Sequence, residues 1–311
     1  MEKAPFYNDV AKGPANGAAY WVTASDGVRL RVAYWPGGDK GTVLLFPGRT
    51  EFVEKYGRAA ASLTELGYHV LAIDWRGQGL ADRLLDDPML GHVENFSDYQ
   101  LDVAAMVSAA DSLKCPRPRF LIAHSMGGCI ALRALHEGMP VKAVAFSAPM
   151  WGMSVAPALR PFAVPILRTL NMLGKGHTRA PGTDGETYVK SAAFKGNTLT
   201  TDADMYAYMQ RQAAQHPEMT LIGPTVNWVR LALAETAALQ KMTPPKYPAV
   251  TFLGDNERIV NSNVIKDIMS RWKRGELKII AGAEHEIMME KPKIRAAFFA
   301  AADALFYNNS R

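Results

Sequence analysis

The chain has 311 residues, of which 48% are hydrophobic and 21% charged, and this balance excludes an intrinsically disordered protein. The formal net charge of +5 is too small, and the basic residues are too scattered, to indicate nucleic-acid binding. Neither the first ten residues nor any apolar window has the composition of a signal peptide or a membrane-spanning helix. We therefore expect a cytoplasmic globular protein with no nucleic-acid partner.

Short apolar segments with the length of buried strands alternate with segments of helical spacing over the first half of the chain. A β-hairpin is predicted first, with Asp26-Gly27 at its turn. The later strands are predicted at 42–46, 69–74, 120–123 and 141–147, and helices at 54–66, 99–113 and 129–135. This alternation is typical of βαβ crossovers, so we expect a mainly parallel sheet that helices cover on both faces.

The alternation stops after Met150 and resumes near Pro248. The intervening residues, 151–247, are rich in Pro, Met and Ala and contain helical patches but no buried strand, which predicts a helical cap, or lid, inserted into the sheet domain. Residues 1–150 and 248–311 would form the core. The second core segment contributes strands at 249–253 and 277–280 and a closing helix at 291–306.

Ser125 lies at the tip of a predicted strand–turn–helix unit. The apolar run 120–123 leads into Ala123-His-Ser-Met-Gly127, and helical spacing resumes at Cys129. The pattern resembles the G-x-S-x-G nucleophile elbow, a strained turn that holds a serine hydroxyl above the edge of the sheet, with Ala123 in place of the first glycine. The pentapeptide alone is equally compatible with an ordinary turn and a capping serine. His124 is expected to point away from the serine.

A serine hydroxyl becomes a nucleophile when a histidine accepts its proton and an acid orients that histidine. His285 follows the 277–280 strand, so it should lie on a loop at the carboxyl end of the sheet, where α/β enzymes place their sites. The chain order of serine, acid and histidine agrees with hydrolases of this topology. The sequence therefore supplies both a candidate nucleophile and a candidate base.

Two acids follow the 249–253 strand, and the sequence does not separate them by spacing alone. Glu257 is favoured because Ile259-Val260 can pack beneath its loop. Asp255 is the alternative acid; if Glu257 is the acid, Asp255 would be a turn residue that pairs with Arg258.

The backbone amides of Arg49 and Met126 are the candidate oxyanion-hole donors. Met126 follows the candidate nucleophile, and Arg49 belongs to the loop after the 42–46 strand, the two places from which such donors come in this topology. Gly48 would let that loop turn inward. The alternative is that Pro47-Gly48 forms an ordinary turn with no role in an oxyanion hole.

Motifs spread over nearly the whole chain resemble the bacterial lysophospholipase and monoacylglycerol lipase group of the α/β-hydrolase superfamily. They are Phe46-Pro-Gly-Arg-Thr-Glu51 with Lys55-Tyr56, Asp74-Trp-Arg-Gly-Gln-Gly79, Leu90-Gly-His-Val93, Ala123-His-Ser-Met-Gly-Gly128, Gly223-Pro-Thr225 with Trp228, Glu257-Arg-Ile-Val260 and His285-Glu-Ile-Met288. The resemblance implies an α/β-hydrolase fold with Ser125 as nucleophile, Glu257 as acid and His285 as base. Pro47-Gly48 and Glu257 resemble the lysophospholipase branch more than the monoacylglycerol lipases, which carry His-Gly and an aspartate there.

We therefore expect a serine hydrolase of lipid metabolism that cleaves monoacyl lipid esters, lysophospholipids above all, through an acyl-enzyme on Ser125 and without a cofactor or metal. The alternatives are a monoacylglycerol lipase, a small-ester or amide hydrolase with the same triad, and a catalytically idle scaffold that serves as a binding module. The sequence leaves the oligomeric state open.

Apolar residues of the cap either line an acyl-chain channel or simply pack on the core; they are Trp151, Met153, Phe162, Ile166, Leu167, Met172 and Leu173. Basic residues outnumber acids in the cap and include Arg160, Arg168, Lys175, Arg179, Lys190 and Lys195. They would either attract a phosphate head group or an anionic membrane surface, or form a solvated face. Peripheral contact with a membrane therefore remains open beside the lipid-ester substrate.

Overall fold

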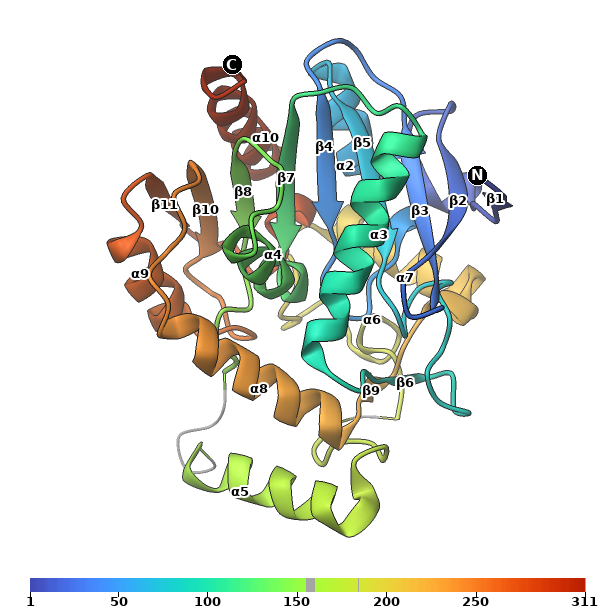
Figure 1. Cartoon of the computed structure of the whole chain (residues 1–311), viewed down its shortest axis with the longest axis vertical. Coiled ribbons are helices and arrows are strands. Elements are labelled where there is room, and N and C mark those ends of the chain that lie inside the picture. Colours follow the sequence, from blue (N-terminus) through green and yellow to red (C-terminus); the bar gives the residue numbers. More distant parts are fainter. Residues whose placement is uncertain (155–159, 184, 311) are drawn as a thin grey trace.

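The computed structural model describes residues 1–154, 160–183 and 185–310, and a nine-stranded sheet runs through its centre (Figure 1). The strand order is β1-β2-β3-β5-β4-β7-β8-β10-β11. The strands are β1 (Lys3–Ala4), β2 (Ala18–Thr23), β3 (Arg29–Trp35), β4 (Thr42–Phe46), β5 (His69–Asp74), β7 (Arg119–His124), β8 (Val144–Ser147), β10 (Ala249–Gly254) and β11 (Gly275–Ile280). The predicted hairpin is the antiparallel pair β2–β3, and all pairings from β5 to β11 are parallel. The predicted fold class is confirmed.

Helices cover both faces of this sheet (Figure 1). The helices of the described residues are α1 (Asn8–Ala11), α2 (Gly57–Glu65), α3 (Tyr99–Ser112), α4 (Met126–His136), α5 (Arg160–Leu170), α6 (Tyr188–Ser191), α7 (Ala203–Gln215), α8 (Val226–Gln240), α9 (Ser262–Arg271) and α10 (Pro292–Asn308). A short 3₁₀ helix, Val53–Tyr56, precedes α2. The predicted helix at 54–66 is therefore two helices in sequence, joined at Gly57.

Strand β4 illustrates why the central strands are uniformly apolar. Val43 and Leu45 pack into the hydrophobic core on one face of the sheet, and Leu44 and Phe46 into the core on the other. Successive side chains of a strand point to opposite faces, so a strand covered on both sides needs apolar residues at every position. Strand β4 therefore lacks the alternation of apolar and polar residues that is typical of a strand with one face exposed to solvent.

The segment 151–247, in the part that the structure describes, lies across the carboxyl ends of the parallel strands (Figure 1). It contributes α5 to α8 and also β9 (Gly223–Pro224), which pairs with β6 (Leu90–Gly91). The expectation that 151–247 contains no buried strand is wrong at β9, where both residues are buried. Among the described residues, no helix is long and apolar enough to cross a membrane.

Candidate active site

Ser125 occupies a strained position between the end of β7 and the start of α4. Its backbone φ is 48° and ψ is −118°, a conformation that non-glycine residues adopt only when their surroundings enforce it. The Ser125 carbonyl accepts hydrogen bonds from the amides of Gly128 and Met150, both at 2.8 Å, and its own amide donates to the Ser147 carbonyl at 3.1 Å. The turn is thus fixed by α4 on one side and by β8 and the loop after it on the other.

Small residues after the serine let β4 and α4 approach each other. A Cβ atom on Gly127 would lie 2.3 Å from the Phe46 carbonyl oxygen and 2.5 Å from that of Pro47, and one on Gly128 would lie 2.5 Å from Pro149 Cβ. Neither glycine can be replaced without moving backbone. The contact also brings the loop after β4 next to the start of α4.

His285 and Glu257 form a hydrogen-bonded pair at the carboxyl ends of β11 and β10. His285 Nδ1 lies 2.7 Å from Glu257 Oε2, and the other carboxylate oxygen accepts from the amides of Ile259 (2.7 Å) and Val260 (3.0 Å). Burial favours the neutral acid, but the His285 interaction and these hydrogen bonds outweigh it and lower the pKa of Glu257. Since an ionised carboxylate only accepts, His285 Nδ1 carries the proton and Nε2 is left free to take another.

Asp255 does not contact the histidine. Its side chain is exposed and accepts a hydrogen bond from the Gly282 amide at 2.7 Å, which ties the loop after β10 to the loop after β11. The pairing of Asp255 with Arg258 expected from the sequence is wrong, because Arg258 binds Glu284 at 2.8 Å. Of the two candidate acids, the structure places Glu257 beside His285.

The loop after β4 is held by side chains whose role the sequence did not reveal. Trp75 Nε1 donates to the Pro47 carbonyl at 2.9 Å, and Gln78 Nε2 donates to the carbonyls of Gly48 and Glu51 at 2.9 and 3.1 Å. The carboxylate of Glu51 accepts from the Gly48 amide. The Arg49 amide has no hydrogen-bond partner among the described residues, which leaves it available to a ligand.

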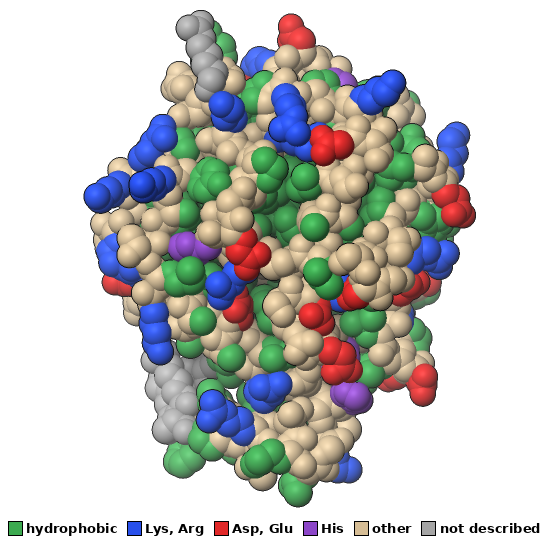
Figure 2. Space-filling model, in the orientation of Figure 1, with side chains coloured by type: hydrophobic (Ala, Val, Ile, Leu, Met, Phe, Trp, Pro, Cys, Tyr) green, Lys and Arg blue, Asp and Glu red, His purple; other side chains and the backbone are tan. Residues whose placement is uncertain are grey.

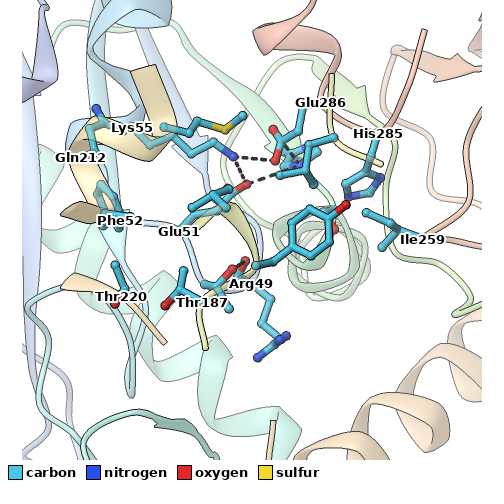
Figure 3. A pocket seen from close by; sticks show the side chains of 18 of the residues that line it. Arg49, Glu51, Phe52, Lys55, Thr187, Gln212, Thr220, Ile259, His285 and Glu286 are labelled. Carbon is cyan, nitrogen blue, oxygen red and sulfur yellow. Dashed lines mark hydrogen bonds and ion pairs between the residues drawn. The ribbon is translucent and has the colours of Figure 1, made fainter. Parts of the chain in front are cut away.

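One cavity of about 390 Å³ brings these parts together, because Ser125, His285 and Arg49 all line it. Figure 3 labels Arg49 and His285 among the side chains around it. Its other walls come largely from the inserted segment and from the loop after β4: Thr50, Phe52, Thr187, Tyr188, Val189, Leu199, Met209, Gln212, Ala213 and Thr220. The inserted segment also anchors the histidine loop, since the carbonyls of Thr198 and Leu199 accept hydrogen bonds from the amides of His285 (3.3 Å) and Glu286 (2.8 Å).

The apolar residues for which lining of an acyl-chain channel and packing on the core were both open do not line this cavity. Trp151 is fully buried against Phe146 and Trp272, whereas Phe162, Ile166, Met172 and Leu173 are exposed to solvent. The hydrophobicity of a residue does not show whether its side chain lines a cavity, packs in the core or is exposed to solvent. The side chain of Arg160 lies outside the described residues.

Residues 37–292 match the family model described as serine aminopeptidase, S33. The chain belongs to this family.

Lysophospholipase L2 of Escherichia coli strain K12 is 34% identical over 288 residues, which cover 86% of this chain and 81% of that protein. The probable lysophospholipase L2 of Haemophilus influenzae is 28% identical and covers 81% of this chain and 79% of its own length. A soluble variant of the Saccharomyces cerevisiae monoglyceride lipase superposes with a TM-score of 0.71 at 20% identity over 93% of this chain and 95% of that one, a likeness that shows the α/β-hydrolase fold. The predicted family is confirmed, and with it the prediction of an ester hydrolase.

Proposed function

We propose that the protein hydrolyses carboxylic esters of monoacyl lipids, with lysophospholipids as the preferred substrates, through an acyl-enzyme on Ser125. The observation that carries the proposal is that His285, oriented by Glu257 at 2.7 Å, lines the same cavity as the strained Ser125. A nucleophile, a base and an oriented acid are what acyl transfer by a serine requires.

In the proposed reaction, Ser125 Oγ attacks the acyl carbonyl while His285 Nε2 takes its proton, and Glu257 stabilises the imidazolium that forms. The amides of Arg49 and Met126 bind the oxyanion; loss of one such donor typically costs about 10²- to 10³-fold in turnover. His285 then protonates the departing alcohol. Water, activated by the same imidazole, attacks the acyl-enzyme and releases the fatty acid and free Ser125.

The charges at the cavity favour a lipid ester over a peptide. An aminopeptidase must bind the ammonium group of its substrate, but Glu51 and Glu286, two carboxylates that line the cavity, are both bonded to Lys55. Apolar groups such as Phe52, Met209 and Ala213 suit an acyl chain instead. The lysophospholipase relatives support the same substrate class.

The test is turnover of a defined lysophosphatidylcholine beside the monoacylglycerol of the same acyl chain. A higher kcat/KM for the lysophospholipid supports the proposal, and the reverse preference would assign the protein to monoacylglycerol hydrolysis. A fluorophosphonate probe should label the wild type but not Ser125→Ala. A wild type that neither turns over these esters nor labels would instead indicate a binding module.

We also propose that residues 151–247 act as a cap that meets membrane lipid. Several apolar side chains of α5 and the turn after it are exposed, among them Phe162 (59%), Met172 (79%) and Leu173 (69%). Arg168 and Lys175 lie in the same stretch, and Figure 2 shows hydrophobic and basic side chains together at the lower end of the molecule, over α5. Exposed apolar groups flanked by cations suit an anionic bilayer surface.

A further inference from the structure

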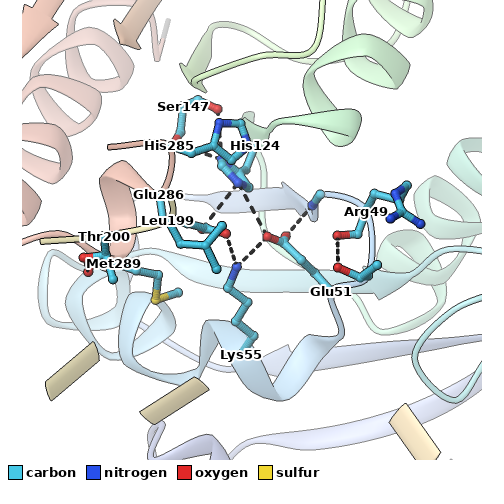
Figure 4. A network of polar contacts seen from close by, with 12 residues as sticks. Arg49, Glu51, Lys55, His124, Ser147, Leu199, Thr200, His285, Glu286 and Met289 are labelled. Atoms are coloured by element: carbon cyan, nitrogen blue, oxygen red, sulfur yellow. Dashed lines mark hydrogen bonds and ion pairs between the residues drawn. The ribbon is translucent and has the colours of Figure 1, made fainter. Parts of the chain in front are cut away.

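Four charged side chains form a buried cluster beside the catalytic cavity: Glu51, Lys55, His124 and Glu286 (Figure 4). Lys55 Nζ donates to Glu51 Oε1 and, at 2.6 Å, to Glu286 Oε1. His124 Nε2 lies 3.3 Å from Glu286 Oε2 and 3.5 Å from Glu51 Oε1. No side chain of the four is more than 7% exposed. Charges this deeply buried are rare unless they are paired.

The contacts of His124 favour a charged imidazole. Its Nδ1 lies 3.0 Å from the Ser147 carbonyl oxygen, which only accepts, and 3.1 Å from the Ser147 hydroxyl, so a proton on Nδ1 satisfies the carbonyl. Its Nε2 faces the two carboxylates without the alignment of a full hydrogen bond, and their charge favours a second proton there. Burial alone would lower the pKa of His124, but Glu286 and Glu51 outweigh burial and raise it. With both of its ring nitrogens protonated, His124 joins Lys55 in balancing the two carboxylates, so that the cluster is neutral.

The carboxylates and the imidazole lie close enough together to suggest a metal site, since the ligand atoms of Glu51, His124 and Glu286 are within 4.8 Å of one another. The Lys55 ammonium, however, already bonds to both carboxylates. It occupies the place and supplies the charge that a bound cation would. The cluster is thus complete as an ion network made by the protein alone.

Three members of the cluster belong to three different catalytic segments, and the fourth, Lys55, links two of them. Glu51 accepts from the Gly48 amide and so fixes the loop that carries Arg49. His124 directly precedes Ser125, and Glu286 directly follows His285. Lys55 lies on the 3₁₀ helix before α2 and bonds to two of the three. We propose that this neutral ion cluster holds the oxyanion loop, the serine turn and the histidine loop in register, and that its four residues are positioning residues for the hydrolysis; this rests on the proposed function.

The cluster also sets the charge next to the base. The rings of His124 and His285 lie 4.8 Å apart between centroids. The titratable and charged groups that contact His285, share its cavity or belong to the cluster beside it include Glu257, His124, Glu286, Lys55, Glu51, Tyr188, Tyr56, which donates to Glu51, and the Glu284–Arg258 pair. Removal of one cation from the cluster leaves a net negative charge that stabilises protonated His285. Removal of one anion leaves a net positive charge that disfavours it.

The experiment compares Lys55→Met with Glu286→Gln in the full-length protein. We expect both to lower kcat/KM at the optimum by about 10²-fold, because a small misplacement of catalytic groups has an effect of this size. The acid limb of the pH–rate profile should move to higher pH in Lys55→Met and to lower pH in Glu286→Gln, by about one unit in each case. The profile is to be measured both for ester turnover and for the rate of fluorophosphonate labelling.

Three further variants keep the outcome clear. His124→Asn removes a cation from a different element and should move the limb in the same direction as Lys55→Met, so the result does not depend on one variant folding. Lys55→Arg keeps the charge and should restore the wild-type limb. Arg58→Met removes a cation from the adjoining helix α2, where Arg58 pairs with the exposed Asp204, and should leave the profile unchanged.

The proposal would be overturned if the acid limb of the pH–rate profile stayed at its wild-type pH in every folded variant while activity fell equally at all pH values. The cluster would then have only a structural role. Limbs that move in the same direction in Lys55→Met and Glu286→Gln would also overturn it. A wild type without esterase activity or labelling would instead contradict the proposed function, so the two failures are distinguishable.

Discussion

The carboxylate of Glu257 makes the hydrogen bonds that the acid of a catalytic triad would need. One oxygen holds His285 Nδ1 and the other is held by the Ile259 and Val260 amides, so the imidazole has a fixed orientation and tautomer. Sequence analysis favoured Glu257 as the acid and kept Asp255 as the alternative. The spacing of two acids on one loop could not show that Asp255 turns to the Gly282 amide.

We predict that Glu257→Gln lowers kcat by about 10⁴-fold, because an amide in place of a triad carboxylate favours the wrong histidine tautomer. Asp255→Asn retains an acceptor for the Gly282 amide and should leave kcat near that of the wild type. Steady-state kinetics of the two purified variants measures this difference. Small and equal losses in both would contradict the assignment of Glu257 as the acid.

At the scale of elements, most predicted strands and the long helices agree with the structure because each is a strongly apolar or strongly periodic segment. The strand predicted at 141–147 forms only at Val144–Ser147. Helix α9 was missed although Asn261 caps it by accepting from the Asn263 amide at 3.1 Å. It has only ten residues, mostly polar, and buries Ile265, Ile268 and Met269 alone. The ion cluster was beyond prediction, because Lys55 and Glu286 are 231 residues apart.

Helix α7 supplies one wall of the cavity, and this wall should limit acyl-chain length. Ala213 is buried on the cavity side of α7, and its neighbour Ala214 is exposed. We predict that Ala213→Leu shifts the preference to shorter acyl chains by filling part of the cavity, whereas Ala214→Leu does not. A series of lysophospholipids of graded chain length tests this. If Ala213→Leu had the same acyl-chain-length preference as the wild type, the acyl chain would bind elsewhere.

The contact between α4 and the end of β4 gives a second prediction for these elements. A methyl group on Gly127 would collide with the carbonyl oxygens of Phe46 and Pro47, so Gly127→Ala must displace the loop that carries the Arg49 amide. We expect kcat to fall more than KM changes, since the oxyanion contact develops in the transition state. Rate measurements on variant protein whose circular dichroism matches the wild type would check this, and a loss confined to KM would refute it.

For the whole molecule, buried charges link stability to pH. The pKa values of Glu257 and Glu286 are depressed. Burial opposes the shift, but the His285 interaction and two backbone amides outweigh it at Glu257, and Lys55 and His124 outweigh it at Glu286. A carboxyl with a depressed folded pKa stabilises the fold above its unfolded pKa, and this contribution is lost as pH falls through the folded value. The raised pKa of His124 acts in the opposite sense, with stability present below the ordinary value of 6.5 and lost as pH rises through the folded value.

We therefore predict that the unfolding temperature of the wild type falls as pH drops below about 4.5, the ordinary glutamate value. The difference in unfolding temperature between the wild type and Glu286→Gln should become smaller over the same pH range. The difference in unfolding temperature between the wild type and His124→Asn should become smaller as pH rises above the ordinary histidine value of 6.5. Thermal denaturation followed by circular dichroism over a range of pH measures both differences. Differences that stay constant with pH would show that these groups titrate alike in the folded and unfolded chain.

The burial of the ion cluster has one further consequence. Dissolved salt screens charges that face water far more than charges enclosed by protein. Rising ionic strength should thus weaken the attraction of Arg168 and Lys175 to an anionic bilayer while turnover of a substrate below its micellar concentration hardly changes. A single sodium chloride titration, followed by vesicle sedimentation and by ester hydrolysis, would separate how the protein reaches lipid from how it cleaves it.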